Sequence, residues 1–205
     1  MSCLYQVILI FCIALVMLFS PQIAQAQQLS APINLKGDRT IQLGAEDLFK
    51  RGVYEALIGN YKAAIENFTQ VIHLRPDDAT AYANQGLARA ALGDRFGAIE
   101  DFNSAVRLNP DLEVAYYNRG YVRFELQDYQ GAIADFNRAI QIDPLKVEAY
   151  HCRCLVRHQL GDMQGVLEDL HTVEELYLKL GKIEEYQGLL NNIKKLLSQN
   201  DSSIL

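Results

Sequence analysis

The strongest constraint on the fold is a repeat of fixed length that runs through most of the chain. Pro76, Pro110 and Pro144 are equally spaced, and other residue types recur at the same interval without gaps. A period of about 34 residues indicates a solenoid in which each repeat stacks on its neighbours. The recurring columns hold Phe68, Phe102, Phe136 and Leu170; Gly52, Gly86, Gly120 and Cys154; Ala64, Ala98, Ala132 and Val166; and Leu48, Tyr82, Tyr116 and Tyr150.

Each repeat has the pattern of two amphipathic helices separated by a turn. Apolar residues follow the i, i+3, i+4, i+7 spacing, and turn residues interrupt them at Gly59-Asn60, Gly93-Asp94, Gln127-Asp128 and Gly161-Asp162. The small residues of the Gly and Ala columns should let the two helices approach closely around the Phe. We expect helices at residues 45–58, 61–74, 79–92, 95–108, 113–126, 129–142, 147–160 and 163–178.

The period and its columns resemble the tetratricopeptide repeat family from Ala45 to about Leu178. The style of the repeats is similar to that common in bacterial, notably cyanobacterial, proteins. The resemblance implies an all-α, right-handed α-solenoid of helix-turn-helix units at 45–78, 79–112, 113–146 and 147–178. A capping helix, expected at 182–198 within a C-terminal segment of 179–205, would cover the open end. Binding to a partner or to a membrane surface is the alternative for this helix.

The first 26 residues have the layout of a secretory signal peptide. An apolar run from Val7 to Phe19 is followed by Ser20-Pro21 and by the small-x-small site Ala24-Gln25-Ala26. The run is short for a membrane span, which favours a signal peptide. The segment before the run departs from the usual signal peptide, because it lacks Lys and Arg. We therefore expect an exported protein, in a periplasm, a lumen or outside the cell, with cleavage after Ala26. Membrane tethering through residues 7–19 is the alternative, and residues 27–44 form a flexible linker.

Charge and cysteine content exclude several classes of protein. The net charge of −6 argues against nucleic acid as a partner, because the phosphate backbone requires a basic surface.

Removal of the signal would leave only Cys152 and Cys154. Two residues apart on one helix, they point to different sides and are poorly placed for a disulfide. We expect at least one of them to be buried as a small hydrophobe.

Motifs for catalysis are absent from the sequence, so we expect no enzyme, no catalytic residue and no cofactor. His151, Cys154 and His158 share one helical stripe and could present metal ligands. Cys154 occupies the column held elsewhere by Gly, however, so a buried structural role is the preferred interpretation and no metal is expected.

Two charged columns also repeat with the period. They contain Arg89, Arg123 and Arg157, and Asp101, Asp135 and Asp169. Pairing of Arg and Asp as exposed ion pairs is preferred over a ladder of Arg that faces an acidic partner. Exposed pairs of this kind contribute only about 0–1 kcal/mol.

The resemblance implies that the first helix of each unit lines a concave binding groove. Tyr117, Tyr121 and Phe124 form an aromatic stripe, and the core-facing stripe of the same helix is assigned to Tyr116 and Gly120. We therefore expect the aromatic stripe to face outwards and bind a partner, with packing under a neighbouring helix as the alternative. The expected groove residues are Phe49, Asn84, Leu87, Tyr117, Asn118, Tyr121, Phe124, His151, Leu155 and His158.

One subclass of the family holds the C-terminal carboxylate of chaperone tails with a Lys/Asn/Arg clamp. Its positions fall here on Phe49, Val53, Asn84, Val114 and Asn118, and only Asn84 matches. We therefore expect no preference for a free acidic C-terminus. The expected function is an exported, non-catalytic scaffold that binds a protein or peptide segment and meets a membrane only through an uncleaved N-terminal segment. The alternatives are a self-associating structural solenoid and, last, a metal-binding protein that uses His151, Cys154 and His158.

Overall fold

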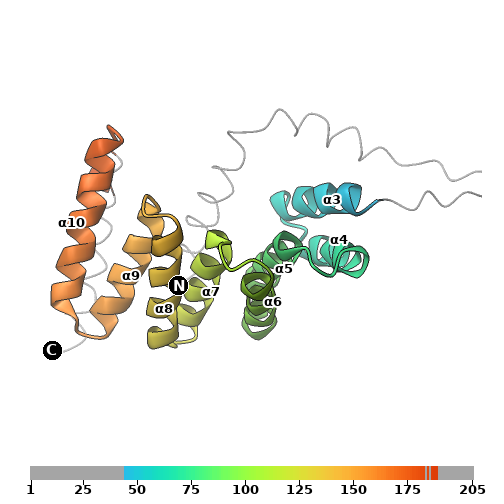
Figure 1. The fold of residues 1–205 in the computed structure, drawn as a ribbon, viewed down its shortest axis with the longest axis horizontal. Coiled ribbons are helices and arrows are strands. Elements are labelled where there is room, and N and C mark those ends of the chain that lie inside the picture. The colour runs from blue at the N-terminus through green and yellow to red at the C-terminus, as the bar shows by residue number, and fades with distance from the viewer. Residues whose placement is uncertain (1–43, 183, 185, 189–205) are drawn as a thin grey trace, which may run out of the picture. The chain divides into compact units, whose positions relative to one another are not determined.

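The computed structural model describes residues 44–182, 184 and 186–188, and the ordered elements of this part are all α-helices (Figure 1). Each helix begins at the residue expected from the sequence and ends within one residue of it. The all-α fold is therefore confirmed for this part of the chain. The helices are α3 (Ala45–Leu57), α4 (Tyr61–Leu74), α5 (Ala79–Ala91), α6 (Arg95–Leu108), α7 (Glu113–Glu125), α8 (Tyr129–Ile142), α9 (Val147–Gln159) and α10 (Met163–Lys179).

The helices pack as consecutive hairpins, each with a first helix (A) and a second helix (B). The hairpins are α3–α4, α5–α6, α7–α8 and α9–α10. The chain divides after Pro110 into two compact units, each of which holds two of these hairpins. In unit 1, α5 also packs against α4, and in unit 2, α9 packs against α8. Each unit is therefore a stacked pair of repeats with its own core.

Glycine and phenylalanine set the close approach of the two helices in a hairpin. Phe68, Phe102 and Phe136 on the B helices are fully buried. A Cβ atom placed on Gly120 would lie 3.0 Å from Phe136 Cε1, and one on Gly52 would lie 2.7 Å from Phe68 Cε1. Contacts this short leave no room for a side chain, so the Gly column is required by the Phe column.

The turn between the two helices requires a left-handed residue. Gly59, Gly93 and Gly161 have φ values of 80°, 84° and 76° at this position. In the third hairpin the position belongs to Gln127, whose φ is 64°. A side chain is strained in this conformation, whereas glycine adopts it readily.

An Asp after the turn caps the B helix in three of the four hairpins. The side chains of Asp94, Asp128 and Asp162 accept hydrogen bonds from the backbone N–H groups of Gly97, Gly131 and Gly165. These bonds satisfy donors that the first turn of a helix leaves open. In α4 the corresponding residue is Asn60, which makes no such bond.

Helix α10 has 17 residues, three more than the other B helices. Beyond it, residues 184 and 186–188 are helical. The Tyr186 ring lies 6.0 Å from the Tyr177 ring and packs at a cluster formed by Val147, Val173 and Leu176. The expected capping helix otherwise lies outside the described residues, as do the signal peptide at 1–26 and all but the last residue of the linker at 27–44.

Candidate functional site

Buried ion clusters

A buried carboxylate on α8 is held by two arginines from α7. Asp135 is 3% exposed. Arg119 Nε and Nη2 donate to Asp135 Oδ2 and Oδ1 at 3.0 and 2.6 Å, and Arg123 Nη1 donates to Oδ2 at 2.7 Å. A charged group in a core is tolerated only when it is paired and hydrogen-bonded, and this arrangement satisfies both oxygens.

The same cluster recurs one repeat later. Arg153 on α9 donates hydrogen bonds to both carboxylate oxygens of Asp169 on α10. Arg157 Nη1, also on α9, lies 3.0 Å from Asp169 Oδ2. Arg157 Nη1 also donates a hydrogen bond to the backbone carbonyl of Gly165 at 2.8 Å. A Cβ atom on Gly165 would collide with Arg157 Cδ and would obstruct this contact. The Arg157 and Asp169 positions therefore depend on glycine at position 165.

In the second hairpin the cluster is incomplete. Arg89 Nη1 lies 3.0 Å from Asp101 Oδ2, but this oxygen is buried and has no hydrogen bond. The second arginine is replaced by Gln85, whose Nε2 donates instead to Thr69 Oγ1 at 2.7 Å. Burial raises the pKa of Asp101 to about 7, and Arg89 opposes this shift.

The first hairpin lacks the repeated Arg–Asp pair. Glu55 stands in place of the repeated Arg, and Asn67 in place of the buried Asp. Asn60 Nδ2 donates to Glu55 Oε2 at 2.8 Å, and Asn67 Nδ2 donates to the carbonyl of Ala63 at 2.7 Å. Glu55 and Asn67 are therefore both hydrogen-bonded within the first hairpin.

These contacts confirm the expected pairing of Arg89, Arg123 and Arg157 with Asp101, Asp135 and Asp169. The expectation that the pairs are exposed is wrong, because the three Asp residues are 5%, 3% and 1% exposed. The sequence interpretation also missed Arg119 and Arg153 as partners of the buried Asp residues. These two arginines are one repeat apart, but the equivalent position in the preceding repeat is Gln85, so the column is not uniform.

The helix A surface

Tyr117 does not face outwards as expected. It is 4% exposed and belongs to a cluster with Phe136, Ala149, Cys152 and Val156. Its hydroxyl lies 3.6 Å from Cys152 Sγ on α9. The alternative of packing under a neighbouring helix is therefore correct for this residue, because α9 covers this side of α7.

The surroundings of Tyr117 are charged on one side. Lys146 Nζ lies 5.4 Å from the Tyr117 ring centroid and 3.6 Å from Glu113 Oε1. Burial raises the pKa of Glu113, while Lys146 lowers it. Tyr116, which was assigned to the core stripe, is only half-buried, and Arg119 and Arg138 lie over its ring at 5.4 and 5.8 Å.

The other two residues of the aromatic stripe retain accessible surface. Tyr121 and Phe124 are half-buried and pack against the Tyr117 cluster. The Phe124 ring lies 6.0 Å from the ring of Tyr129 at the start of α8. One turn before Tyr121, Asn118 is also half-buried and donates to the carbonyl of Val114 at 2.7 Å. Asn118, Tyr121 and Phe124 are hereafter called the α7 surface.

The predicted residues of α9 are half-buried as well. They are His151, Leu155 and His158. His151 Nε2 is buried without a hydrogen-bond partner, and burial lowers the pKa of this imidazole to about 4. It is therefore neutral at pH 7.

In unit 1 the predicted residues Phe49, Asn84 and Leu87 are also half-buried. The Phe49 ring lies 5.6 Å from that of Phe68, so Phe49 contributes to the core of its hairpin. Asn84 Nδ2 donates to the carbonyl of Thr80 at 2.8 Å, the same i to i−4 bond that Asn118 makes in unit 2.

The two cysteines are free and buried, at 4% exposure for Cys152 and 2% for Cys154. Burial, and then the Asp169 charge, raise the pKa of Cys154 to about 11, so its thiol is unreactive at neutral pH. Within the part of the chain that the structure describes, no three His, Cys, Asp or Glu side chains form a group that could hold a metal ion. Over the same residues, no helix is long and apolar enough to cross a membrane.

Similarity to known proteins

Three family profiles match the chain. Tetratricopeptide repeat profiles match residues 79–112 and 114–144, and a further TPR repeat profile matches residues 55–93. No curated protein has significant similarity to the sequence.

Solved structures of similar fold include several repeat proteins. A crystal structure of MamA is 27% identical, with a TM-score of 0.65, and the match covers 68% of this chain and 81% of that one. The first TPR domain of Spaghetti (RPAP3), bound to an HSP90 peptide SRMEEVD, is 29% identical, with a TM-score of 0.56 and coverage of 57% and 93%. The TPR domain of Arabidopsis OM64 is 26% identical, with a TM-score of 0.55 and coverage of 56% and 95%. Together with the hairpins and their columns, these matches show that residues 55–144 of the chain contain tetratricopeptide repeats.

Proposed function

We propose that the chain is an exported, non-catalytic interaction module that binds an extended or helical segment of a partner protein on its helix A surfaces. The observation that carries the proposal is the α7 surface, where Tyr121 and Phe124 keep accessible aromatic area on a helix whose other side is packed. Aromatic side chains of this kind are frequent anchors in binding sites. The RPAP3 domain, which has the same fold, is bound to a peptide.

The polar groups beside the aromatic residues suit a peptide backbone. Asn118 commits one N–H of its amide group to Val114, which fixes the orientation of the side chain. An amide held in this way offers a donor and an acceptor, the two groups that a peptide unit requires. Leu155 and His158 on α9 extend the proposed site within unit 2, and Asn84 and Leu87 supply the corresponding positions in unit 1. Of the positions that correspond to the Lys/Asn/Arg carboxylate clamp, only Asn84 matches. We therefore propose that the bound peptide does not require a free C-terminal carboxylate.

The test uses the full chain and a displayed library of random peptides. Peptides selected by the wild type are synthesised with a free and with an amidated C-terminus, and binding is measured by fluorescence anisotropy. We expect Tyr121→Ala and Phe124→Ala each to weaken binding by about tenfold, which corresponds to about 1.4 kcal/mol. Amidation should leave the affinity unchanged.

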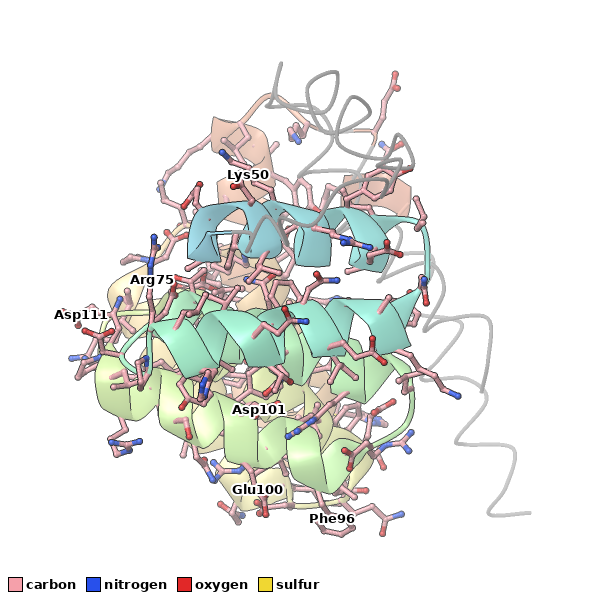
Figure 2. All side chains as sticks on the ribbon, turned by 90° about the vertical axis from the view of Figure 1, so that its right-hand side faces the viewer. Lys50, Arg75, Phe96, Glu100, Asp101 and Asp111 are labelled. Carbon is pink, nitrogen blue, oxygen red and sulfur yellow. The ribbon has the colours of Figure 1, made fainter. Side chains whose placement is uncertain are left out.

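The matched control is Phe96→Ala. Phe96 lies on α6 with 74% of its surface exposed, and its side chain projects from the edge of the helix in Figure 2. Circular dichroism must show that all three variants retain their helix content. Equal affinity for the wild type and the α7 variants, or an equal loss in Phe96→Ala, would refute the α7 surface as the binding site. Loss of binding on amidation would refute the proposal about the carboxylate.

Export is tested separately, because it rests on residues outside the described part of the chain. The N-terminal sequence of the protein isolated from its native host should begin at Gln27. A protein that keeps Met1 to Ala26 and stays in the membrane fraction would favour the tethered alternative.

A further inference from the structure

The charged groups beside Tyr117 are mostly carboxylates. Glu113 and Glu148 lie in the first turns of α7 and α9, and Asp143 follows the last residue of α8. Burial raises the pKa of Glu113, Lys146 lowers it, and the charges of Asp143 and Glu148 raise it further. Three carboxylates therefore share the ammonium group of Lys146, which lies 3.6 Å from Glu113 Oε1. Glu113, Asp143 and Glu148 are hereafter called the acidic end of unit 2.

The arginines of α7 and α9 do not neutralise this acidic end. Each of them binds a buried carboxylate on a B helix, Asp135 or Asp169, and its side chain is 12–24% exposed. The four residues are Arg119, Arg123, Arg153 and Arg157. A guanidinium group that is committed to a buried carboxylate cannot move to a ligand without leaving that charge unpaired. These arginines are therefore not available to an acidic ligand.

Glu148 is the exposed member of the acidic end, and the other two members are half-buried. The next residue, Ala149, packs in the cluster that contains Tyr117, and the aromatic residues of the α7 surface pack against the same cluster. One repeat earlier, the equivalent position is Val114, which is one of the positions of the carboxylate clamp. A carboxylate at this position would repel the group that the clamp holds, so the local charge favours the opposite kind of ligand.

We propose that the segment bound by unit 2 carries an arginine or lysine side chain that lies at Glu148, while its apolar side chains pack on Tyr121 and Phe124. This inference rests on the proposed function and names the chemical class of the segment that the α7 surface binds. Opposite charges across an interface favour the correct partner, and like charges exclude incorrect ones. The face of an aromatic ring also attracts a cation. Segments rich in Asp or Glu are therefore disfavoured.

The length of α7 sets the spacing within the bound segment. Glu113 marks the acidic end on this helix, and Tyr121 and Phe124 lie about 12 and about 16 Å from it along the axis, at about 1.5 Å per residue. An extended chain advances about 3.3 Å per residue, so it covers these distances in about four to five residues. The basic residue should therefore lie about four or five positions from the apolar anchors.

Two displayed libraries of random peptides test the proposal with the full chain. One library encodes Lys and Arg but neither Asp nor Glu, and the other encodes Asp and Glu but neither Lys nor Arg. The wild type should enrich peptides from the basic library, and Glu148→Lys should shift the enrichment to the acidic library. The matched control is Glu66→Lys, which changes the net charge equally at an exposed position of α4 and should keep the wild-type preference.

Fluorescence anisotropy with the best basic peptide measures the size of the effect. Glu148→Gln should weaken binding about two- to fivefold and Glu148→Lys about tenfold, because an exposed ion pair contributes little and a like-charge contact repels. A peptide whose basic residue is replaced by Glu should bind Glu148→Lys more tightly than the wild type. An acidic residue that serves only the first turn of α9 would not produce this exchange. Circular dichroism must show that the variants keep their helix content.

Equal enrichment from the two libraries, or an equal loss of affinity in Glu148→Lys and Glu66→Lys, would overturn the inference. The α7 variants distinguish this failure from a failure of the proposed function. If Tyr121→Ala and Phe124→Ala still weaken binding, the α7 surface is the binding site and only the preference for a basic segment is wrong. If they also leave the affinity unchanged, the proposed function is wrong as well.

Discussion

The incomplete cluster around Asp101 predicts that Gln85→Arg stabilises the protein. At the equivalent positions in unit 2, Arg119 and Arg153 donate two or more hydrogen bonds to the buried Asp of their hairpin. Asp101 has Arg89 alone, and its Oδ2 lacks a hydrogen bond. An arginine at position 85 would supply the missing donors. Since Arg153 also donates to Asn137, the new side chain should be able to keep a contact with Thr69.

The magnitude follows from the pKa of Asp101. It is raised from 3.8 to about 7, so the unfolded chain loses the proton near pH 4 and the folded chain only near pH 7. Asp101 therefore makes its full contribution to the free energy of unfolding below pH 4, where it is protonated in both states. Between about pH 4 and pH 7 this contribution declines by about 1.4 kcal/mol per pH unit, a total of roughly 4 kcal/mol. Gln85→Arg lowers the folded pKa and should recover about 1–3 kcal/mol of this loss at pH 8, after the desolvation of the new arginine.

Urea unfolding at pH 8 and at pH 5 measures the effect, and carbon NMR of the Asp101 carboxyl group measures the pKa directly. The gain should be larger at pH 8, where the carboxylate is ionised, and should disappear in an Asp101→Asn background. The reciprocal change, Arg119→Gln, should cost about 3 kcal/mol at pH 8, because it removes two hydrogen bonds from the buried Asp135 carboxylate. A Gln85→Arg gain that is independent of pH, or that persists with Asn at position 101, would refute the reasoning.

Three further predictions concern single positions. Gln127→Gly should raise the free energy of unfolding by about 0.5–1 kcal/mol, because φ is 64° there; chemical denaturation should show no such gain for Gln127→Ala. Gly120→Ala should destabilise by about 1–3 kcal/mol, because the new methyl group meets the Phe136 ring at 3.0 Å; an unchanged urea midpoint would contradict the packing argument. The lowered pKa of His151 predicts a contribution to stability that is complete above pH 6.5 and is lost as the pH falls from 6.5 to about 4; His151→Gln should remove this part of the pH profile of unfolding.

The helices and hairpins could be predicted because a fixed period reports the same structure several times. Agreement of the aligned units at Gly59, Gly93 and Gly161 locates the turns even where Gln127 breaks the pattern. The Gly and Phe columns likewise predict a close approach that the structure confirms. In each case the prediction depends on local spacing and on steric size, which are visible in the sequence itself.

The accessibility of individual side chains could not be predicted in the same way. Periodicity places Tyr117 and Tyr121 on one stripe of α7, but it does not show how far α9 covers that stripe. The boundary falls between the two residues, so Tyr117 is buried and Tyr121 is half-buried. The burial of Asp135 was missed for a related reason. A repeated charge is interpreted as a surface residue until Arg119 and Arg123 are seen to enclose it.

The uneven distribution of the Arg–Asp clusters has a consequence for local opening of the chain. In repeat proteins, stability is approximately a sum over repeats and their interfaces, so a weak hairpin at an end opens on its own. The α3–α4 hairpin has no buried ion cluster among its described residues, and α4 has no side-chain cap at Asn60. Its amide hydrogens should therefore exchange with solvent faster than those of α7 and α8. Proteases should therefore first cut the described part of the chain at the Gly59 turn.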